Sequence, residues 1–188
     1  MAQKGFSIDL TSCGGCKCCQ VSCKDKNNLN VGEFFRRVVE VEGGVYPAPW
    51  VYNVSMACAH CTSPACMAAC PSGAITKQAI TGSASDGVVT INASLCVGCR
   101  RCEWACPYGA PTFIAATGKM AKCDACKGEL DAGGTPTCVG ACPMRVLKFD
   151  DIATLQAQAG AVSAIKNYAN PALTGANVVF IPKAVALP

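Results

Sequence analysis

The chain has 188 residues, a length that suits one domain or two small fused modules. It carries 17 cysteines but only 6% aromatic residues, so something other than large side chains must fill its core. The formal net charge is +4, with no concentrated basic stripe and no aromatic platform, which argues against a nucleic-acid-binding protein. No apolar run reaches the roughly 18 residues of a membrane-spanning helix. We therefore expect a soluble chain, or one that attaches to a membrane through a partner.

Short strands and single helical turns are expected along most of the chain. Apolar or alternating segments with Gly and Asp at their ends predict strands at residues 5–10, 50–56, 86–92 and 145–149. One or two helical turns are expected at residues 67–70 and 100–106. A weak helix at residues 151–160 is expected to precede an irregular tail.

Two segments stand outside this series. The stretch "FFRRVVEVEGGVYPAPW" within residues 24–50 predicts a hairpin that turns at Gly43-Gly44. The apolar segment 151–188 has too little chain of its own to pack on. We expect it to lie against a partner or against the back of the cysteine-rich part.

The cysteines form four groups of four with closely related spacing. Three residues separate the last two cysteines of every group, and a proline follows the last cysteine in groups II, III and IV. Group I is Cys13, Cys16, Cys19 and Cys23; group II is Cys58, Cys61, Cys66 and Cys70; group III is Cys96, Cys99, Cys102 and Cys106; group IV is Cys123, Cys126, Cys138 and Cys142.

This spacing suits cubane clusters, whose four iron corners each take one thiolate. A CxxCxxC loop places three sulfurs around one cube, and a fourth cysteine on the next helical turn faces another cube, as in bacterial ferredoxins. The proline then turns the chain away. We expect Gly14, Gly15 and Gly98 to let the backbone approach the clusters. The pattern predicts an α+β, ferredoxin-like fold with four [4Fe–4S] clusters on sixteen of the 17 cysteines.

Disulfides and zinc are the competing explanations. An odd cysteine count, a chain that is not short and no secretory segment before Cys13 argue against a disulfide scaffold. Zinc ribbons use CxxC pairs but do not call for a third cysteine followed by CxxxCP. Cys18 is left over, because Cys19 and not Cys18 restores the common spacing. We expect Cys18 to be a packed or surface thiol; the alternative is that it replaces a damaged Cys19.

The sequence contains no Ser/His/Asp set, no phosphate-binding loop and no open metal site, so no catalytic site is expected. His60 is expected to hydrogen-bond or pack within its loop rather than to ligate iron or relay protons. Trp104 is expected to cover a cluster from water, with a protein contact as the second explanation. The arginines Arg36, Arg37, Arg100 and Arg101 are expected to be solvated or to compensate cluster charge, with docking as the alternative.

The chain resembles the four-cluster iron–sulfur subunits of molybdopterin oxidoreductases, most closely the subunit of anaerobic dimethyl sulfoxide reductases. The resemblance covers about residues 5–155 and rests on "GFSIDLTSCGGCKCCQVSCKD", "FRR", "CAHCTSPACMAACPSGAI", "LCVGCRRCEWACPYGAP", "KCDAC" and "CVGACPMRVLKFDDI". It implies a double bacterial ferredoxin of two pseudo-twofold modules, with a hairpin insert and a C-terminal extension. Residues 1–55 and 112–188 would carry groups I and IV, and residues 56–111 would carry groups II and III.

Sequence order alone also allows group I to pair with II and group III with IV. Nested pairing is favoured because the insert at 24–50 separates groups I and II, and the resemblance points the same way. The implied ligand sets are Cys13, Cys16, Cys19 and Cys142 for cluster 1; Cys58, Cys61, Cys66 and Cys106 for cluster 2; Cys96, Cys99, Cys102 and Cys70 for cluster 3; and Cys123, Cys126, Cys138 and Cys23 for cluster 4.

The resemblance further implies a heterotrimer with a molybdopterin catalytic subunit and an integral membrane subunit that oxidises quinol. Electrons would pass groups III, II, IV and I in that order. The chain would be membrane-associated through the complex, at the cytoplasmic face or exported with a catalytic partner that bears a twin-arginine signal. The alternatives are a related thiosulfate, polysulfide, tetrathionate, nitrite or formate system, a free polyferredoxin, and a structural or sensor protein with clusters.

Overall fold

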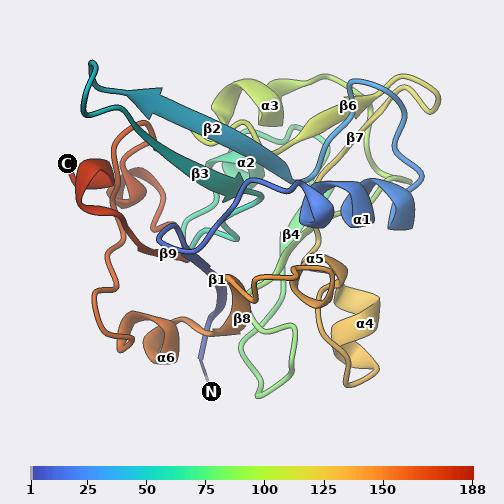
Figure 1. Ribbon diagram of the computed structural model, residues 1–188. Coiled ribbons are helices and arrows are strands. Elements are labelled where there is room, and N and C mark those ends of the chain that lie inside the picture. The colour runs from blue at the N-terminus through green and yellow to red at the C-terminus, as the bar shows by residue number, and fades with distance from the viewer. Residues whose placement is uncertain (1) are drawn as a thin grey trace.

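A three-stranded sheet joins segments from the two ends of the chain (Figure 1). In the computed structural model, which describes residues 2–188, β1 (Lys4–Asp9) lies between β8 (Leu147–Asp151) and β9 (Val178–Ile181). β8 runs antiparallel to β1, with Phe6 opposite Phe149, and β9 runs parallel to it. The sheet therefore ties the start of the chain to its apolar tail.

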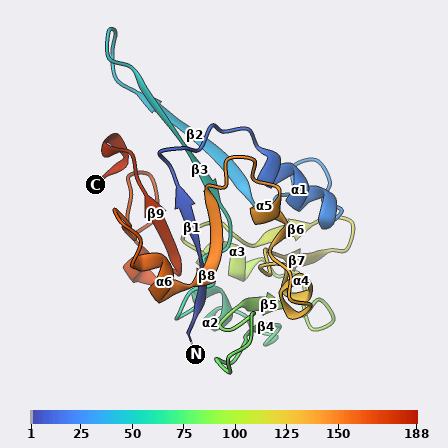
Figure 2. The ribbon, with the colours of Figure 1, turned by 60° about the horizontal axis from the view of Figure 1, so that its bottom comes forward.

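The other strands form three antiparallel pairs. They are β2 (Arg37–Gly43) with β3 (Trp50–Met56), β4 (Ile75–Lys77) with β5 (Val89–Ile91), and β6 (Thr112–Ile114) with β7 (Lys119–Ala121). The β2–β3 hairpin projects from the rest of the molecule as a long arm (Figure 2). The result is a mixed α and β structure of small sheets.

Short helices connect these strands. They are α1 (Cys18–Lys26), α2 (Ala65–Ala68), α3 (Arg101–Ala105), α4 (Lys127–Asp131), α5 (Thr137–Gly140), α6 (Ile152–Gln156), and the 3₁₀ turns η1 (Pro171–Leu173) and η2 (Ala184–Ala186). Within residues 2–188, no helix has both the length and the apolar character needed to cross a bilayer.

The strand and helix expectations hold at most positions. The strand expected at 50–56 is β3, and the one expected at 5–10 is β1 shifted by one residue. The strand expected at 145–149 begins only at Leu147, because Arg145 has a left-handed backbone with φ of 54°. The helical turns expected beside the cysteines are α2 and α3, and the weak helix of the tail is α6.

The hairpin of the insert turns later than predicted. Gly43 still pairs with Trp50, so the connection is the six-residue segment 44–49 and not a tight turn at Gly43-Gly44. Pro47 and Pro49 lie in this segment and cannot donate ladder hydrogen bonds, which lengthens the loop. Gly43 serves packing instead, because a Cβ there would lie 2.4 Å from the Trp50 ring.

The tail is more regular than predicted. It contains β9, whose residues Val179 and Phe180 are 1% and 0% exposed. Of the two positions expected for the tail, the structure shows the one against the chain's own body, since β9 pairs with β1. A run of four apolar residues has strand length, but the parallel partner that buries it is distant in sequence.

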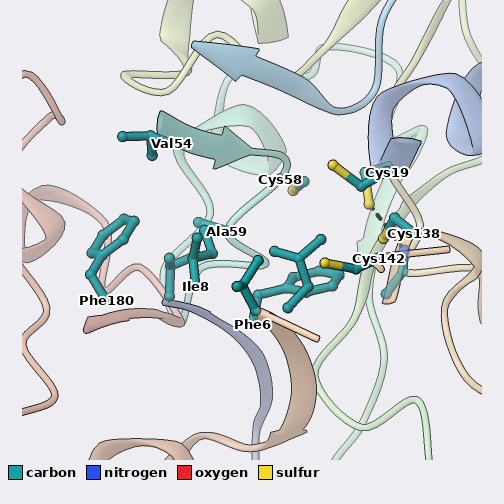
Figure 3. Close-up of a cluster of buried hydrophobic side chains, with 14 of the residues drawn as sticks. Phe6, Ile8, Cys19, Val54, Cys58, Ala59, Cys138, Cys142 and Phe180 are labelled. Atoms are coloured by element: carbon teal, nitrogen blue, oxygen red, sulfur yellow. Dashed lines mark hydrogen bonds between the residues drawn. The ribbon is translucent and has the colours of Figure 1, made fainter. Parts of the chain in front are cut away.

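Thiols form a large part of the core. The main cluster of buried residues joins Phe6, Ile8 and Phe180 to cysteines of groups I, II and IV. Figure 3 shows Cys19, Cys138 and Cys142 gathered at one end of this cluster and Phe180 at the other. A second core combines Cys66 and Cys102 with Ile75, Val89 and Met120. These two cores agree with the expectation that groups other than large side chains fill the centre.

Candidate iron–sulfur centres

Each cysteine group begins with a loop of the same backbone shape. The residue two positions after the first cysteine is left-handed in every group: Gly15 (φ 70°), His60 (43°), Gly98 (69°) and Ala125 (57°). In groups II, III and IV its N–H donates to the first cysteine's sulfur, at 3.4 Å from His60 to Cys58, 3.5 Å from Gly98 to Cys96 and 3.4 Å from Ala125 to Cys123. Such bonds stabilise a thiolate.

Only part of this loop geometry could be read from the sequence. Gly15 and Gly98 have the left-handed backbone that glycine favours, and they were expected to allow a close approach. Gly14 was expected to act in the same way, but a Cβ there would meet open space. His60 and Ala125 give no such signal, because neither residue type marks a left-handed position by itself.

The helices of the four groups start in two different ways. In groups I and III, α1 and α3 begin after Lys17 and Arg100, which are left-handed with φ of 60° and 61°. In groups II and IV, α2 and α5 begin directly after Pro64 and Pro136. Because a proline often precedes the first turn of a helix, these two helix starts could have been predicted from the sequence, although they were not.

Packing between these helices brings distant groups together. α1 packs against α5, and α2 packs against α3. The first contact joins group I to group IV, and the second joins group II to group III.

Two small cavities are each lined by four cysteines. Cys13, Cys16, Cys19 and Cys142 line the first, and Cys70, Cys96, Cys99 and Cys102 line the second. In both cavities three sulfurs come from one group and the fourth from its packing partner. Among residues 2–188, no three His, Cys, Asp or Glu side chains lie close enough to share a single metal ion.

The remaining cysteines are electrostatic neighbours in the complementary sets. Burial, together with the charges of Cys58, Cys106 and Cys61, raises the pKa of Cys66 to about 12. Burial likewise raises the pKa of Cys23 to about 11, with Cys138 and Cys126 adding to the rise. Cys106 thus lies with group II, and Cys23 lies with group IV.

Lys122 and His60 surround the Cys58 thiol. The Lys122 side chain is buried, and its Nζ donates to Cys58 Sγ at 3.5 Å, to Cys123 O at 2.9 Å and to Val89 O. Burial acts to raise the pKa of Cys58, but His60 and Lys122 lower it to about 5. Cys123, buried beyond them, has a raised pKa because of burial and the Cys58 charge.

The buried side chain of Arg36 is a positive charge that an anionic cluster would compensate. Its guanidinium is 1% exposed, and no carboxylate among residues 2–188 pairs with it. Two of its buried nitrogens, Nε and Nη2, have no hydrogen-bond partner among the described residues. Burial lowers its pKa, but the charges of Cys138, Cys123, Cys19 and Cys23 raise it overall. A buried cation needs a nearby anion, and cubanes ligated by these thiolates would supply one.

The other residues singled out in the sequence lie at the surface, apart from His60. Trp104 is 79% exposed, so it does not shield a cluster from water as expected, and a protein contact is the explanation that remains. Cys18 is exposed, as expected for the thiol left out of the groups. Arg37, Arg100 and Arg101 are exposed, in contrast to Arg36. His60 is buried and hydrogen-bonded, as expected.

Cavities lined by four thiols, amide donors to sulfur and a buried counter-cation define an iron–sulfur protein. The family of the 4Fe-4S dicluster domain matches residues 49–152. The chain is 39% identical to the probable anaerobic dimethyl sulfoxide reductase chain YnfG of Escherichia coli (strain K12), over 99% of this chain and 92% of that protein. It is 38% identical to a chain of the anaerobic dimethyl sulfoxide reductase of Haemophilus influenzae, with the same coverage.

A more distant relative has another name. A subunit of the sulfite dehydrogenase of Allochromatium vinosum is 34% identical over 81% of this chain and 70% of that protein. The chain belongs to the family of iron–sulfur subunits of anaerobic dimethyl sulfoxide reductases. It is thus a non-catalytic electron-transfer subunit of an oxidoreductase complex.

Proposed function

We propose that this chain carries electrons through four [4Fe–4S] clusters from a membrane subunit that oxidises quinol to a molybdopterin catalytic subunit. The observation that carries the proposal is that two cavities are each lined by four cysteines, three from one group and one from another. The cysteine neighbours of Cys66 and Cys23 support the same arrangement for the remaining cysteines. The terminal acceptor in this proposal is an S-oxide such as dimethyl sulfoxide, because the relatives that are 38–39% identical over 99% of this chain belong to such reductases.

The ligand sets follow the nested pairing. Cluster 1 is held by Cys13, Cys16, Cys19 and Cys142; cluster 2 by Cys58, Cys61, Cys66 and Cys106; cluster 3 by Cys96, Cys99, Cys102 and Cys70; and cluster 4 by Cys123, Cys126, Cys138 and Cys23. The two cysteine-lined cavities support the sets of clusters 1 and 3. The pKa neighbours of Cys66 and Cys23 support the sets of clusters 2 and 4.

Two modules in a pseudo-twofold relation account for the paired helices. The contact of α1 with α5 and that of α2 with α3 are equivalent under such a relation. We place the boundary between the modules after Ala121 rather than at residue 111. The reason is that Met120 packs in the core with Cys66 and Cys102, and its N–H lies 3.4 Å from Cys96 Sγ.

The chain's own residues set the environment of the electron carriers. Bound [4Fe–4S] clusters supply one-electron chemistry, with potentials that depend on charge, hydrogen bonds to sulfur and solvent exposure. The loop amides donate to sulfur, burial excludes water, and Arg36 and Lys122 place positive charge beside the thiolates. The amide donors and the two cations stabilise the reduced, more negative state of a bound cluster. Burial limits the access of water to the thiolates.

The partners and location follow from the same proposal. The chain is held at a membrane through the complex, at the cytoplasmic face or exported with the catalytic subunit. Trp104 lies in group III, and its exposed ring is a candidate contact for the membrane subunit. A related sulfur-oxyanion system is the second candidate, since the sulfite dehydrogenase subunit of Allochromatium vinosum is 34% identical to this chain.

Anaerobic purification from the native host tests the proposal. We expect the chain to co-purify with a molybdenum protein and a membrane protein, and to contain about sixteen iron atoms without stoichiometric zinc. Reduced dyes should then donate electrons to the complex, and dimethyl sulfoxide should reoxidise it. Elution of the chain alone would indicate a free polyferredoxin. Reduction of oxidised dyes by sulfite, without reoxidation of the complex by dimethyl sulfoxide, would favour the second candidate.

A further inference from the structure

His60 occupies a loop position that does not require a histidine. The equivalent positions of the other three groups are Gly15, Gly98 and Ala125, and all four share the left-handed backbone. A small residue is therefore sufficient for this turn. The His60 side chain is nevertheless fully buried, which indicates a role for the ring itself.

The ring lies between two cysteines of different modules. The backbone N–H of His60 donates to Cys58 Sγ at 3.4 Å, and its Nε2 lies 3.9 Å from Cys123 Sγ. The Val89 N–H donates to Nδ1 at 3.1 Å, so in the neutral ring the proton is on Nε2 and faces Cys123. One residue thus links the thiolate of one cluster to that of another by hydrogen bonds.

The surrounding contacts fix His60 in this orientation. Asn177, just before β9, donates from Nδ2 to the His60 carbonyl at 2.8 Å, and the ring of Phe6 lies with its centroid 6.3 Å away. Lys122 lies at the same junction, because its Nζ donates both to Cys58 Sγ and to the backbone of Cys123. Both side chains lie near Cys58 and lower its pKa, but only the His60 ring has its Nε2 on Cys123, at 3.9 Å, and only the Lys122 ammonium donates directly to Cys58 Sγ, at 3.5 Å.

We propose that His60 and Lys122 are the positioning residues of the electron step between clusters 2 and 4, the step that joins the two modules. When bound, the cluster held by Cys58 would supply one electron and the cluster held by Cys123 would accept it, with no bond broken and no proton moved. The His60 donor stabilises the reduced state at Cys123, and Lys122 stabilises it at Cys58. The relative strength of these two effects determines how the electron is distributed between clusters 2 and 4. The inference rests on the proposed four-cluster function.

Two substitutions should shift this balance in opposite directions. His60→Ala removes the donor to Cys123 and leaves the residue type found at position 125, so the loop should keep its cluster. We expect the electron to be shared about tenfold more toward cluster 2, the effect of one hydrogen bond to a charged group. That ratio equals about 59 mV for a one-electron couple. Lys122→Met keeps the length of the side chain but removes its charge, and should move the sharing toward cluster 4.

A matched pair of substitutions separates the donor from the rest of the ring. The amide nitrogen of Gln reaches the place of Nε2, whereas the amide oxygen of Asn replaces only Nδ1 as the acceptor for Val89 N–H. We therefore expect His60→Gln to keep the wild-type balance within about threefold, and His60→Asn to behave like His60→Ala.

The experiment is a redox titration of the whole complex followed by paramagnetic resonance, with iron analysis of each variant. Opposite shifts in the two variants, with wild-type iron content, support the proposal. Unchanged potentials in both variants, or shifts in the same direction, would overturn it. If His60→Ala loses iron, the Gln and Asn variants decide, since equal behaviour of these two also overturns the proposal. Fewer than four clusters in the wild-type complex would instead contradict the proposed function.

Discussion

Arg36 donates two hydrogen bonds from Nη1 to Ser55, at 2.9 Å to the backbone oxygen and at 3.1 Å to Oγ. The same Ser55 Oγ lies 3.2 Å from Cys19 Sγ. The guanidinium also stacks over Phe6, with its carbon 4.6 Å from the ring centroid. These contacts fix a permanent positive charge between the cysteines of groups I and IV.

Arg36→Met should lower the reduction potentials of clusters 1 and 4, because the reduced states lose a neighbouring positive charge. We expect a shift on the order of 60 mV, which corresponds to a factor of ten for one electron. The variant also leaves the Ser55 oxygens without their donor, at a cost of about 1–3 kcal/mol in the free energy of unfolding. Potentiometric titration with paramagnetic resonance measures the potentials. Arg37→Met is the matched control, since Arg37 is exposed and should leave both quantities unchanged.

Cys142→Ser tests the nested ligand sets. Cys142 lines one cavity with Cys13, Cys16 and Cys19, so its loss should turn cluster 1 into a three-iron centre or abolish it. Electron delivery to the catalytic subunit should then fail, while the clusters on the quinol side still become reduced. Paramagnetic resonance of the reduced complex distinguishes the cases. A change confined to the cluster 3 signal would show consecutive pairing instead.

The adjacent thiols Cys18 and Cys19 should behave differently when replaced by serine. Cys19 is buried and lines the first cavity, whereas Cys18 is exposed. Cys18→Ser should keep about sixteen iron atoms, and Cys19→Ser should lose cluster 1 or reduce it to three irons. Iron and sulfide analysis of the two variants, purified in parallel, measures this difference. Loss of a cluster in the Cys18 variant alone would exchange the roles of the two residues.

Phe180→Ala should destabilise the chain by about 3–5 kcal/mol, the usual cost of emptying a buried aromatic site. Phe180 is fully buried on β9 and contacts the Tyr168 ring edge-on, with the centroids 5.1 Å apart. Leu187→Ala is the control, because Leu187 is 41% exposed and should cost less than about 0.5 kcal/mol. Thermal unfolding of the cluster-loaded protein under anaerobic conditions measures both. Equal stability of the two variants would show that β9 does not anchor the tail.

Cluster loading should improve as the pH rises. Burial raises the pKa of Cys66 to about 12 and that of Cys23 and Cys102 to about 11, so these thiols hold their protons at neutral pH. Iron binds thiolates, so loading must release these protons, and acid opposes it. Cys58, with a pKa of about 5, is already a thiolate and releases none.

Reconstitution of the iron-free chain at several pH values measures this effect. Bound iron and released protons should both be followed between about pH 6.5 and about pH 8.5. Iron occupancy should increase across the range. Occupancy that stays constant, or that falls as the pH rises, would contradict the assignment of these thiols as buried ligands.

The cysteine groups could be predicted from the sequence because cluster ligation leaves a spacing that is visible within a few residues. The strands at β1 and β3 were also predictable, since their apolar runs end at clear turn residues. The partner of β9 could not be predicted, because its parallel pairing with β1 joins segments at opposite ends of the chain. The turn of the β2–β3 hairpin was predicted at the wrong place, because Gly43 is the last residue of β2 and leaves space for the Trp50 ring rather than forming the turn.

The electrostatics of the site were harder to predict than its ligands. Four arginines near the cysteine groups look alike in sequence, yet only Arg36 among them is buried. The position of Lys122 could not be predicted, because nothing in the sequence around "CDAC" indicates that this lysine contacts Cys58. Burial of a single charge depends on tertiary packing, and no local pattern reports it.

Exposure differs between the ends and the middle of the proposed electron path. Cys16 of cluster 1 and Cys99 of cluster 3 are exposed, whereas Cys58 of cluster 2 and Cys123 of cluster 4 are buried. Dissolved oxygen and chelators therefore reach the two terminal clusters first. Under the proposed ligand sets, a sample aged in air should lose its connections to both partners first, while its inner clusters still give it colour. In the proposed complex, the partner subunits would cover these ends and so act as a barrier against oxygen.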